Sequence, residues 1–308
     1  MRPQTLALCI PAYNAAEFLP RLLQSAANQT TRFDEILVYD DASTDDTMAV
    51  AKKWGARVIR GEANCGCSQG KNALAAATTC DWIHVHDADD DLKPDFVARA
   101  HHWMDDPDCP DIVLFDYEYR DIASDELIAI RHFDSQALTT DPLRFAITEQ
   151  INPCCGLYRK ADFIRAGGYD TDPTVLYNED CAFHLRMALA GLRFGADDHV
   201  SIINLRRSGS MSSANQAKCV LARLALLRKT APRLTPNYHL ALADELWRTA
   251  RHLAHHQRNE LPDAIALARQ LGRRSPQNEP RWVRHLSYFL PVTIFRFRAA
   301  YIRRRDHA

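Results

Sequence analysis

The first 120 residues alternate between short apolar runs and segments with helical spacing, and this alternation constrains the fold more than any other feature. Residues 6–10, 35–39 and 82–86 are largely apolar runs. Such runs are typical of strands buried on both faces of a sheet. Segments with helical spacing follow, as at Phe18, Leu22, Leu23 and Ala26. Repeated strand–helix units predict an α/β fold with a mostly parallel sheet.

The rest of the chain divides into a continuation of this pattern and a helical end. We expect further strands at residues 57–60, 111–119, 154–159 and 200–204, and helices at 17–27, 68–78, 94–104 and 178–191. The pattern loosens between about residues 121 and 152, which predicts an excursion from the sheet. After about residue 213 the apolar spacing is helical, as at Leu242, Leu246, Ala250 and Leu253. We therefore predict a domain at 1–212 and a helical region at 213–308.

Length, charge and cysteine content narrow the class of protein. A chain of 308 residues suits one large α/β domain with an appendage. The formal net charge of -1 favours neither nucleic acid nor a strongly acidic partner. The nine cysteines lie mostly in apolar segments without zinc-site spacing, which indicates small buried side chains in a reducing compartment. No run resembles a signal sequence or reaches about 18 apolar residues, so we expect a cytoplasmic protein.

Two clusters of aspartates come directly after predicted strands. Asp40 and Asp41 follow one strand, and residues 87–91 include four aspartates after another. Ligands of open α/β sheets bind at the carboxyl ends of the strands. Asp87 and Asp89 could face one Mg²⁺ or Mn²⁺ ion, which usually takes one or two carboxylates plus substrate phosphates. The alternative is a solvated acidic turn that caps the next helix.

Five segments, taken in order, resemble the motifs of glycosyltransferase family 2. They are residues 10–14, 38–45, 64–72, 87–95 and 178–191. The resemblance covers roughly residues 4–212. It implies the GT-A fold, which is a Rossmann-like, mostly parallel sheet flanked by helices, here with a C-terminal helical extension. It also implies inverting transfer of a sugar from a nucleotide-diphosphate sugar.

The resemblance assigns several residues to the nucleotide. Pro11 and Tyr13 would line the base pocket, with the Tyr13 ring stacking near the base, and Asn14 belongs to the same loop. Asp41 would accept a hydrogen bond from a base N–H, which favours uracil and thus a UDP-sugar. Lys71 would lie near the nucleotide, where arginine is more common in the family; lysine keeps the charge but loses the bidentate geometry.

The resemblance also assigns the acidic turn. Asp87 would contact the ribose or a metal-bound water, Ala88 would lie beside the donor, and Asp89 would ligate Mn²⁺ or Mg²⁺ directly. The family often has a further histidine near residues 206–212, but this chain has none between His199 and His239, so a third protein ligand is in doubt. Ordinary structural roles stay open for four polar or aromatic residues: Tyr13, Asp40, Asn64 and Asn72.

The same resemblance implies the catalytic residues. Asp180 would take the proton of the acceptor hydroxyl, and Glu179 would orient the acceptor or the base. A single displacement with one base inverts the anomeric centre. The alternative is that both acids only stabilise the N-terminus of a helix, where the helix dipole favours negative charge. Arg186 could pair with an acid or face solvent, and residues 206–212 could form either a phosphate-gripping lid or a flexible basic loop.

The C-terminal segment mixes basic and aromatic residues. Residues 281–305 contain seven arginines and no acid, interleaved with tryptophan, tyrosine and phenylalanine. This pattern suits a helix that lies on the inner face of the plasma membrane as a peripheral contact. A helix packed on the domain with its arginines outward is the alternative, and nucleic-acid binding is disfavoured because no motif accompanies the basic run.

The family resemblance implies sugar transfer onto a glycan or lipid-linked acceptor in cell-surface polysaccharide or lipopolysaccharide synthesis. Two other functions are alternatives to this one. One is a non-catalytic protein with a transferase fold that binds a glycan or a partner. The presence of Asp89 and Asp180 argues against this alternative. The other is a sugar-phosphate nucleotidyltransferase. That class requires a glycine-rich, basic loop after the first strand, and residues 11–14 are not such a loop. The sequence leaves the donor sugar, the acceptor and the oligomeric state open.

Overall fold

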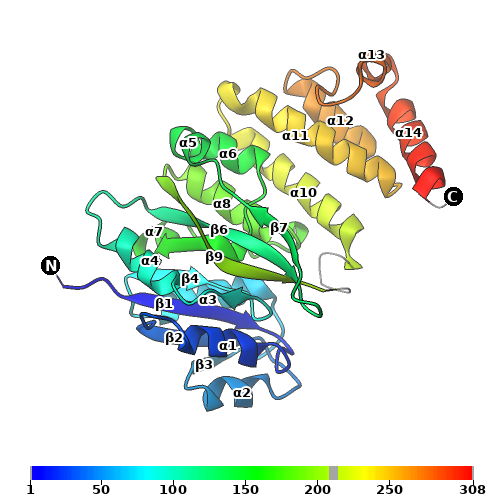
Figure 1. Ribbon diagram of the computed structural model, residues 1–308. Coiled ribbons are helices and arrows are strands. Elements are labelled where there is room, and N and C mark those ends of the chain that lie inside the picture. Colours follow the sequence, from blue (N-terminus) through cyan, green and yellow to red (C-terminus); the bar gives the residue numbers. More distant parts are fainter. Residues whose placement is uncertain (1, 208–213, 307–308) are drawn as a thin grey trace. The chain divides into compact units, whose positions relative to one another are not determined.

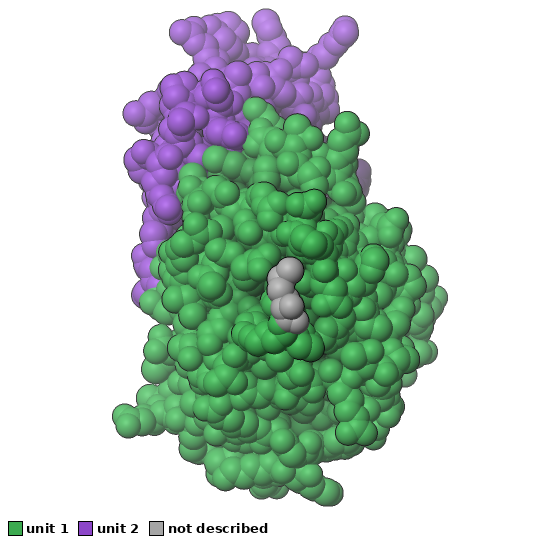
Figure 2. Space-filling model, turned by 90° about the vertical axis from the view of Figure 1, so that its left-hand side faces the viewer, with its two compact units in different colours: residues 1–146, 150–171, 180–208 green, residues 147–149, 172–179, 209–308 purple. Residues whose placement is uncertain are grey.

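The chain divides into two compact units, which a computed structural model describes over residues 2–207 and 214–306 (Figure 1). The N-terminal unit comprises residues 1–146, 150–171 and 180–208, and the C-terminal unit comprises 147–149, 172–179 and 209–308. Figure 2 colours the two units green and purple. The predicted boundary between residues 212 and 213 lies outside the described residues, so it stays a prediction.

The N-terminal unit is built on one sheet with helices packed against it (Figure 1). The strands lie in the order β3-β2-β1-β4-β8-β6-β9-β5, and β7 pairs with β6 at the side. Their bounds are β1 (Leu6–Ala12), β2 (Glu35–Asp40), β3 (Arg57–Arg60), β4 (Trp82–Val85), β5 (Asp91–Leu92), β6 (Ile112–Asp121), β7 (Leu127–Arg131), β8 (Gly156–Arg159) and β9 (Phe194–Arg206). The predicted α/β class with a mostly parallel sheet is confirmed.

The strands that begin the chain form the parallel part of the sheet. β1 lies between β2 and β4 and runs parallel to both, and β2 runs parallel to β3. Every residue of β1 and β4 is buried, which explains why their sequences are largely apolar. β8 differs from the expected pattern, because it inserts antiparallel between β4 and β6. An apolar run carries no information about strand direction, so the sequence alone could not reveal this insertion.

The predicted helices of the N-terminal unit appear within about two residues of their expected ends. The loosened stretch after residue 121 contains β7 and two short helices. The helices are α1 (Leu19–Ala27), α2 (Thr47–Lys53), α3 (Cys67–Ala77), α4 (Phe96–Met104), α5 (Ser135–Thr140), α6 (Pro142–Thr148), α7 (Lys160–Arg165) and α8 (Glu179–Leu189).

The C-terminal unit is helical, as predicted, and several of its helices lie side by side (Figure 1). They are α10 (Gln216–Thr230), α11 (Pro236–His255), α12 (Leu261–Gln270), α13 (Arg281–Phe289) and α14 (Pro291–Asp306). The apolar stripe of α11 is buried, which includes Leu242, Leu246, Ala250 and Leu253. Within residues 2–207 and 214–306, none of the helices has the length and apolar character needed to span a bilayer.

Three buried histidines, His84, His86 and His184, make the N-terminal unit sensitive to acid. His84 Nδ1 lies 2.9 Å from the carbonyl oxygen of Gly156, which links β4 to β8, and His184 Nδ1 lies 2.8 Å from that of Asp180. Burial lowers the pKa of His84 to about 4 and that of His184 to about 3, although each carbonyl opposes the shift. Since the unfolded chain binds these protons near pH 6.5, acidification below that value favours unfolding.

We predict that His84 makes the free energy of unfolding fall by about 2 kcal/mol between pH 7.5 and 5. Burial raises the pKa of Asp90, which acts in the opposite direction, so the comparison must be between variants. Urea unfolding at both pH values should show a smaller pH dependence for His84→Asn than for the wild type. The exposed His102→Asn variant is the control. Equal pH dependence in the wild type and His84→Asn would contradict the prediction.

Candidate active site

The loops after β1 and β2 meet at the carboxyl ends of these strands. Asn14, which has a positive φ of 48°, accepts a 2.9 Å hydrogen bond at its side-chain oxygen from the backbone N–H of Thr44. Its own N–H donates to Ser43 Oγ at 2.9 Å. Tyr13 stands out from this junction with half of its surface exposed, whereas Pro11 is buried at the end of β1. A ring with this exposure can stack on a planar ligand.

The two aspartates at the end of β2 have different partners. Asp40 is fully buried and accepts hydrogen bonds from Arg60 Nη1 at 2.6 Å and the N–H of Ser43 at 3.0 Å, which is a structural arrangement. Asp41 accepts hydrogen bonds from the backbone N–H groups of Cys65 and Gly66 at 2.9 and 2.8 Å. These contacts fix the loop before α3. An ionised carboxylate has further acceptor sites, so Asp41 can still receive another N–H.

The acidic turn after β4 is fixed at its centre by Asp90, while Asp87 and Asp89 remain partly exposed. Asp90 is buried and accepts hydrogen bonds from Asn204 Nδ2 at 2.6 Å and the N–H of Leu205 at 2.8 Å. Burial, together with the charges of Asp87 and Asp89, raises the pKa of Asp90 well above its usual value. Asp89 retains about a third of its side-chain exposure, and Ala88 beside it is buried. The turn therefore presents Asp87 and Asp89 while Asp90 holds it to β9.

A cation already lies against the predicted metal ligand. Arg207 Nη2 is 3.2 Å from Asp89 Oδ2, and the guanidinium also lies 4.5 Å from the centre of the Phe18 ring. The rest of the predicted lid, residues 208–212, lies outside the described residues. Arg207 thus gives the acidic turn a positively charged neighbour at the end of β9.

Lys71 joins the acidic turn to the head of α8. This side chain is 1% exposed, and its Nζ lies 3.2 Å from Asp180 Oδ1 and 4.0 Å from Asp87 Oδ1. The same Nζ is 4.7 Å from the centre of the Tyr169 ring. Burial would lower the pKa of the ammonium, but the nearby carboxylates, Asp180 above all, raise it well above its usual value. Lys71 is therefore a charged, buried link between the two acidic segments.

Asp180 begins a buried polar network inside the N-terminal unit. Its carbonyl oxygen faces His184 Nδ1, and His184 Nε2 lies 3.0 Å from the hydroxyl of Tyr158. Burial raises the pKa of Tyr158 well above its usual value. Farther along α8, Arg186 pairs with Asp170 at 3.2 Å, which matches the acid-paired alternative. These contacts fix the first turns of α8, which carry Asp180.

A glycine turn completes the support around Lys71. The side chain of Asn72 donates to the carbonyl of Tyr169 at 2.9 Å and accepts the N–H of Tyr169 at 2.8 Å. Gly168 has a φ of 59°, and a Cβ there would lie 2.4 Å from Asn72 Oδ1. This position therefore requires glycine. Asn72 has the turn-stabilising role that was one alternative, and it places the Tyr169 ring beside Lys71.

The sequence-predicted residues thus fall into three groups. Asp87 and Asp180 flank one ammonium, and Asp89 lies two residues from Asp87 on the same turn. Tyr13, Asn14 and Asp41 lie at the adjoining ends of β1 and β2. Glu179 is buried at the first position of α8 but belongs to the C-terminal unit, so its predicted role stays a prediction.

Sequence reasoning did not predict two of these contacts. The Lys71–Asp180 pair joins residues that are 109 positions apart, and the anchoring of Asp90 on β9 joins residues more than 110 apart. A lysine where the family usually has arginine was the one available signal for the first contact. The second had none, because the four clustered aspartates of residues 87–91 look alike in a sequence.

The donor set fits a divalent ion that is shared with a ligand. Within the described residues, no group of three or more His, Cys, Asp and Glu side chains is arranged to hold a metal by itself. Asp87 and Asp89 supply hard carboxylate oxygens from one turn. Mg²⁺ and Mn²⁺ bind in this manner when substrate phosphates and water complete the octahedron. The residues therefore fit a metal diphosphate better than an ion alone.

Two solved structures resemble this chain in fold. TarS of S. aureus, in a structure of residues 1–349 with UDP-GlcNAc, superimposes with a TM-score of 0.72 at 17% identity, over 98% of this chain and 92% of that one. The mannosyltransferase PcManGT from Pyrobaculum calidifontis, in complex with GDP-Man and Mn²⁺, gives a TM-score of 0.58 at 20% identity, over 98% and 85%. This likeness confirms the predicted GT-A fold.

Sequence relatives share shorter segments. An uncharacterized glycosyltransferase of Rickettsia conorii is 28% identical over 67% of this chain and 66% of its own length. The Escherichia coli chondroitin synthase is 33% identical over 31% of this chain, and the Pasteurella multocida hyaluronan synthase is 36% identical over 31%. The chain spans only 15% and 10% of these two synthases. The family described as glycosyl transferase family 2 matches residues 7–163, about half of the chain. The chain, with its parallel strands and its acidic turn after β4, therefore belongs to glycosyltransferase family 2.

Proposed function

We propose that this chain is an inverting glycosyltransferase that moves a sugar from a nucleotide-diphosphate donor, with a UDP-sugar favoured, to a hydroxyl group of an acceptor. One observation carries the proposal. The buried ammonium of Lys71 lies within 4.0 Å of a carboxylate oxygen of both Asp87 and Asp180. A carboxylate assigned to the ribose or the metal of the donor and a carboxylate that can accept a proton thereby share one cation.

The donor side of the proposal rests on the loops at the ends of β1, β2 and β4. Tyr13 offers an exposed ring for the base, and Asp41 offers a carboxylate that can accept a base N–H. TarS with UDP-GlcNAc and PcManGT with GDP-Man show that this fold accommodates donors with either base. Asp87 and Asp89 would hold Mn²⁺ or Mg²⁺. When bound, the metal supplies Lewis acidity that offsets the charge developing on the leaving diphosphate.

The acceptor side of the proposal assigns the proton to Asp180. As the acceptor oxygen attacks the anomeric carbon and the bond to the diphosphate breaks, Asp180 takes the hydroxyl proton. Lys71 orients this carboxylate through their 3.2 Å ion pair. Glu179 would orient the acceptor or the base from the adjacent position. One displacement from the face opposite the diphosphate inverts the anomeric centre.

The acceptor is proposed to be a glycan or a lipid-linked glycan of a cell-surface polysaccharide or lipopolysaccharide. Support comes from the family itself and from relatives named as chondroitin and hyaluronan synthases, of which this chain spans a small part. A sheet of this kind binds a donor through its strand ends, whereas the acceptor depends on surfaces that vary between members.

Calorimetric titration with nucleoside diphosphates tests the donor proposal. UDP should bind in the presence of Mn²⁺, more weakly without it, and more tightly than GDP or dTDP. A screen of nucleotide sugars for release of the diphosphate should then identify the donor. No binding of any nucleotide with either metal would reject the transferase and favour a non-catalytic binding protein. Tighter binding of GDP would reject only the preference for uracil.

A further inference from the structure

The C-terminal unit ends in two helices whose outward residues are apolar and basic. Val283 and Ser287 of α13 are buried, whereas the residues at helical spacing on another face of α13 are exposed. These are Trp282, Leu286 and Phe289, followed by Leu290 in the turn. Phe289 and Leu290 expose 66% and 61% of their surfaces, which is unusual for side chains of this size.

α14 is packed on one side and carries exposed aromatic residues on another. Phe295 and Ala299 are buried, and the Phe295 ring lies 5.6 Å from the ring of Trp247 on α11. Phe297 and Tyr301, one helical turn apart, expose 66% and 64% of their surfaces. For residues 281–305 the sequence left two alternatives, a helix packed on the domain with its arginines outward or a contact with a membrane. In the structure α14 packs, and aromatic residues as well as arginines remain outward.

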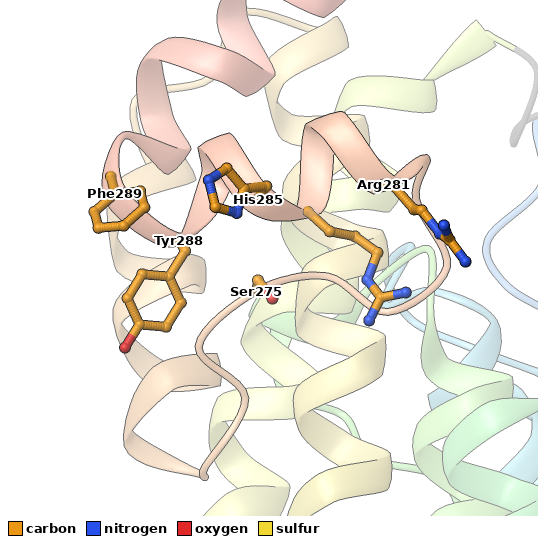
Figure 3. A pocket seen from close by; sticks show the side chains of 6 residues that line it. Ser275, Arg281, His285, Tyr288 and Phe289 are labelled. Atoms are coloured by element: carbon orange, nitrogen blue, oxygen red, sulfur yellow. The ribbon is translucent and has the colours of Figure 1, made fainter.

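A cationic cavity lies beside the exposed residues of α13 (Figure 3). Its volume is about 520 Å³, and it is lined by Ser275, Arg281, Arg284, His285, Tyr288 and Phe289. Figure 3 shows Arg281, His285 and Tyr288 on the helix, with Ser275 on the loop that precedes it. The Tyr288 hydroxyl accepts a 2.7 Å hydrogen bond from Arg274 Nη1, which brings another cation to the same place. Arginine, histidine and hydroxyl groups without an acid among them form a site for a phosphate.

We propose that α13 and the turn after it dock on a bilayer surface that contains anionic phospholipid. A headgroup phosphate would enter the cavity, while Trp282, Phe289 and Leu290 would enter the interfacial region of the bilayer. The exposed aromatic residues distinguish this partner from a soluble anion, because such an anion would leave them in water. The absence of any acid from residues 281–305 matches a negatively charged surface.

Charge also argues against a second copy of the chain as the occupant. A twofold contact between identical surfaces would bring the arginines of one α13 onto those of the other. Arg298 pairs with Glu279 within the unit, and the other six arginines of residues 281–305 have no acidic residue in that segment to pair with across such an interface. A bilayer with anionic lipid removes this repulsion and buries the apolar residues at the same time.

Vesicle flotation with the full chain tests the docking surface. The chain should float with vesicles of phosphatidylcholine and phosphatidylglycerol but not with phosphatidylcholine alone, and rising salt should release it. Arg281→Gln with Arg284→Gln should weaken binding about tenfold or more. Trp282→Ser with Phe289→Ser should weaken it to a similar degree. Circular dichroism shows whether each variant remains folded.

Matched controls and three contrary outcomes make the test decisive. Arg233 and Leu240 are exposed in the same unit, so Arg233→Gln with Leu240→Ser should float like the wild type. Equal flotation of all variants, or equal binding to neutral vesicles, would overturn the proposal. So would displacement by inorganic phosphate beyond the effect of sodium chloride at equal ionic strength, which would indicate a pocket for a soluble anion. Because no nucleotide is present, the result is independent of the transferase proposal.

Discussion

Asp89→Asn should lower the rate of sugar transfer by about 10³-fold, because removing one preorganised electrostatic contact to a leaving group has effects of that size. Asp89 presents its carboxylate from the acidic turn with about a third of its side chain exposed. Asparagine keeps the shape but removes the charge that a divalent ion requires. The same variant should bind UDP equally with and without Mn²⁺. Initial rates with the identified donor and calorimetry measure the two effects.

The control for this variant is an aspartate with similar access to water that lies outside the turn. Asp105 is exposed at the end of α4, so Asp105→Asn should retain the wild-type rate and Mn²⁺ dependence. If Asp89→Asn instead kept its metal-dependent UDP binding, Asp89 would not be a metal ligand, and the donor site would need another acid.

Asp180→Asn should lower kcat by about 10²–10⁴-fold while donor binding stays within a few-fold of the wild type, because general-base catalysis contributes that range. The asparagine oxygen can still accept the hydrogen bond that Lys71 donates to Asp180 Oδ1 at 3.2 Å, so the site should remain in place. The loss should therefore fall on kcat, with the affinity for UDP in the presence of Mn²⁺ changed by no more than a few-fold. Single-turnover rates and calorimetry on one preparation separate the two quantities.

Asp198→Asn provides a matched control, because this aspartate is exposed on β9 of the same unit. It should show wild-type kinetics. An Asp180→Asn variant that turned over normally would exclude Asp180 as the base. A variant that lost UDP binding as well would indicate that the Lys71–Asp180 pair holds the donor site together.

The sequence predicted the positions of the strands better than the order in which they lie in the sheet. The apolar runs at β1, β2 and β4 identify buried strands, since burial on both faces favours apolar residues. The antiparallel position of β8 depends on its hydrogen bonds with β4 and β6, which are long-range. The grouping of residues 172–179 with the C-terminal unit is long-range as well, since Asp172 pairs with Lys229 at 2.8 Å. Local patterns carry no record of such contacts.

The candidate site shows the same limit at the level of side chains. Motif spacing identified Asp87, Asp89 and Asp180 as residues at strand and helix ends, where polar side chains gather. It did not indicate that Lys71 is buried between two of them, or that Asp41 already receives two backbone N–H groups. Both facts depend on contacts between residues far apart in the sequence. Residue type therefore indicated a role for each side chain but not the partners that it contacts.

The attachment of Asp90 to β9 gives the acidic turn a fixed reference in the sheet. Asp90 accepts a hydrogen bond from the N–H of Leu205. Two residues later along the chain, Arg207 forms an ion pair with Asp89. Adjacent aspartates thus take their positions from the same strand end. A displacement at the end of β9 would therefore move Asp90 together with the arginine that contacts Asp89.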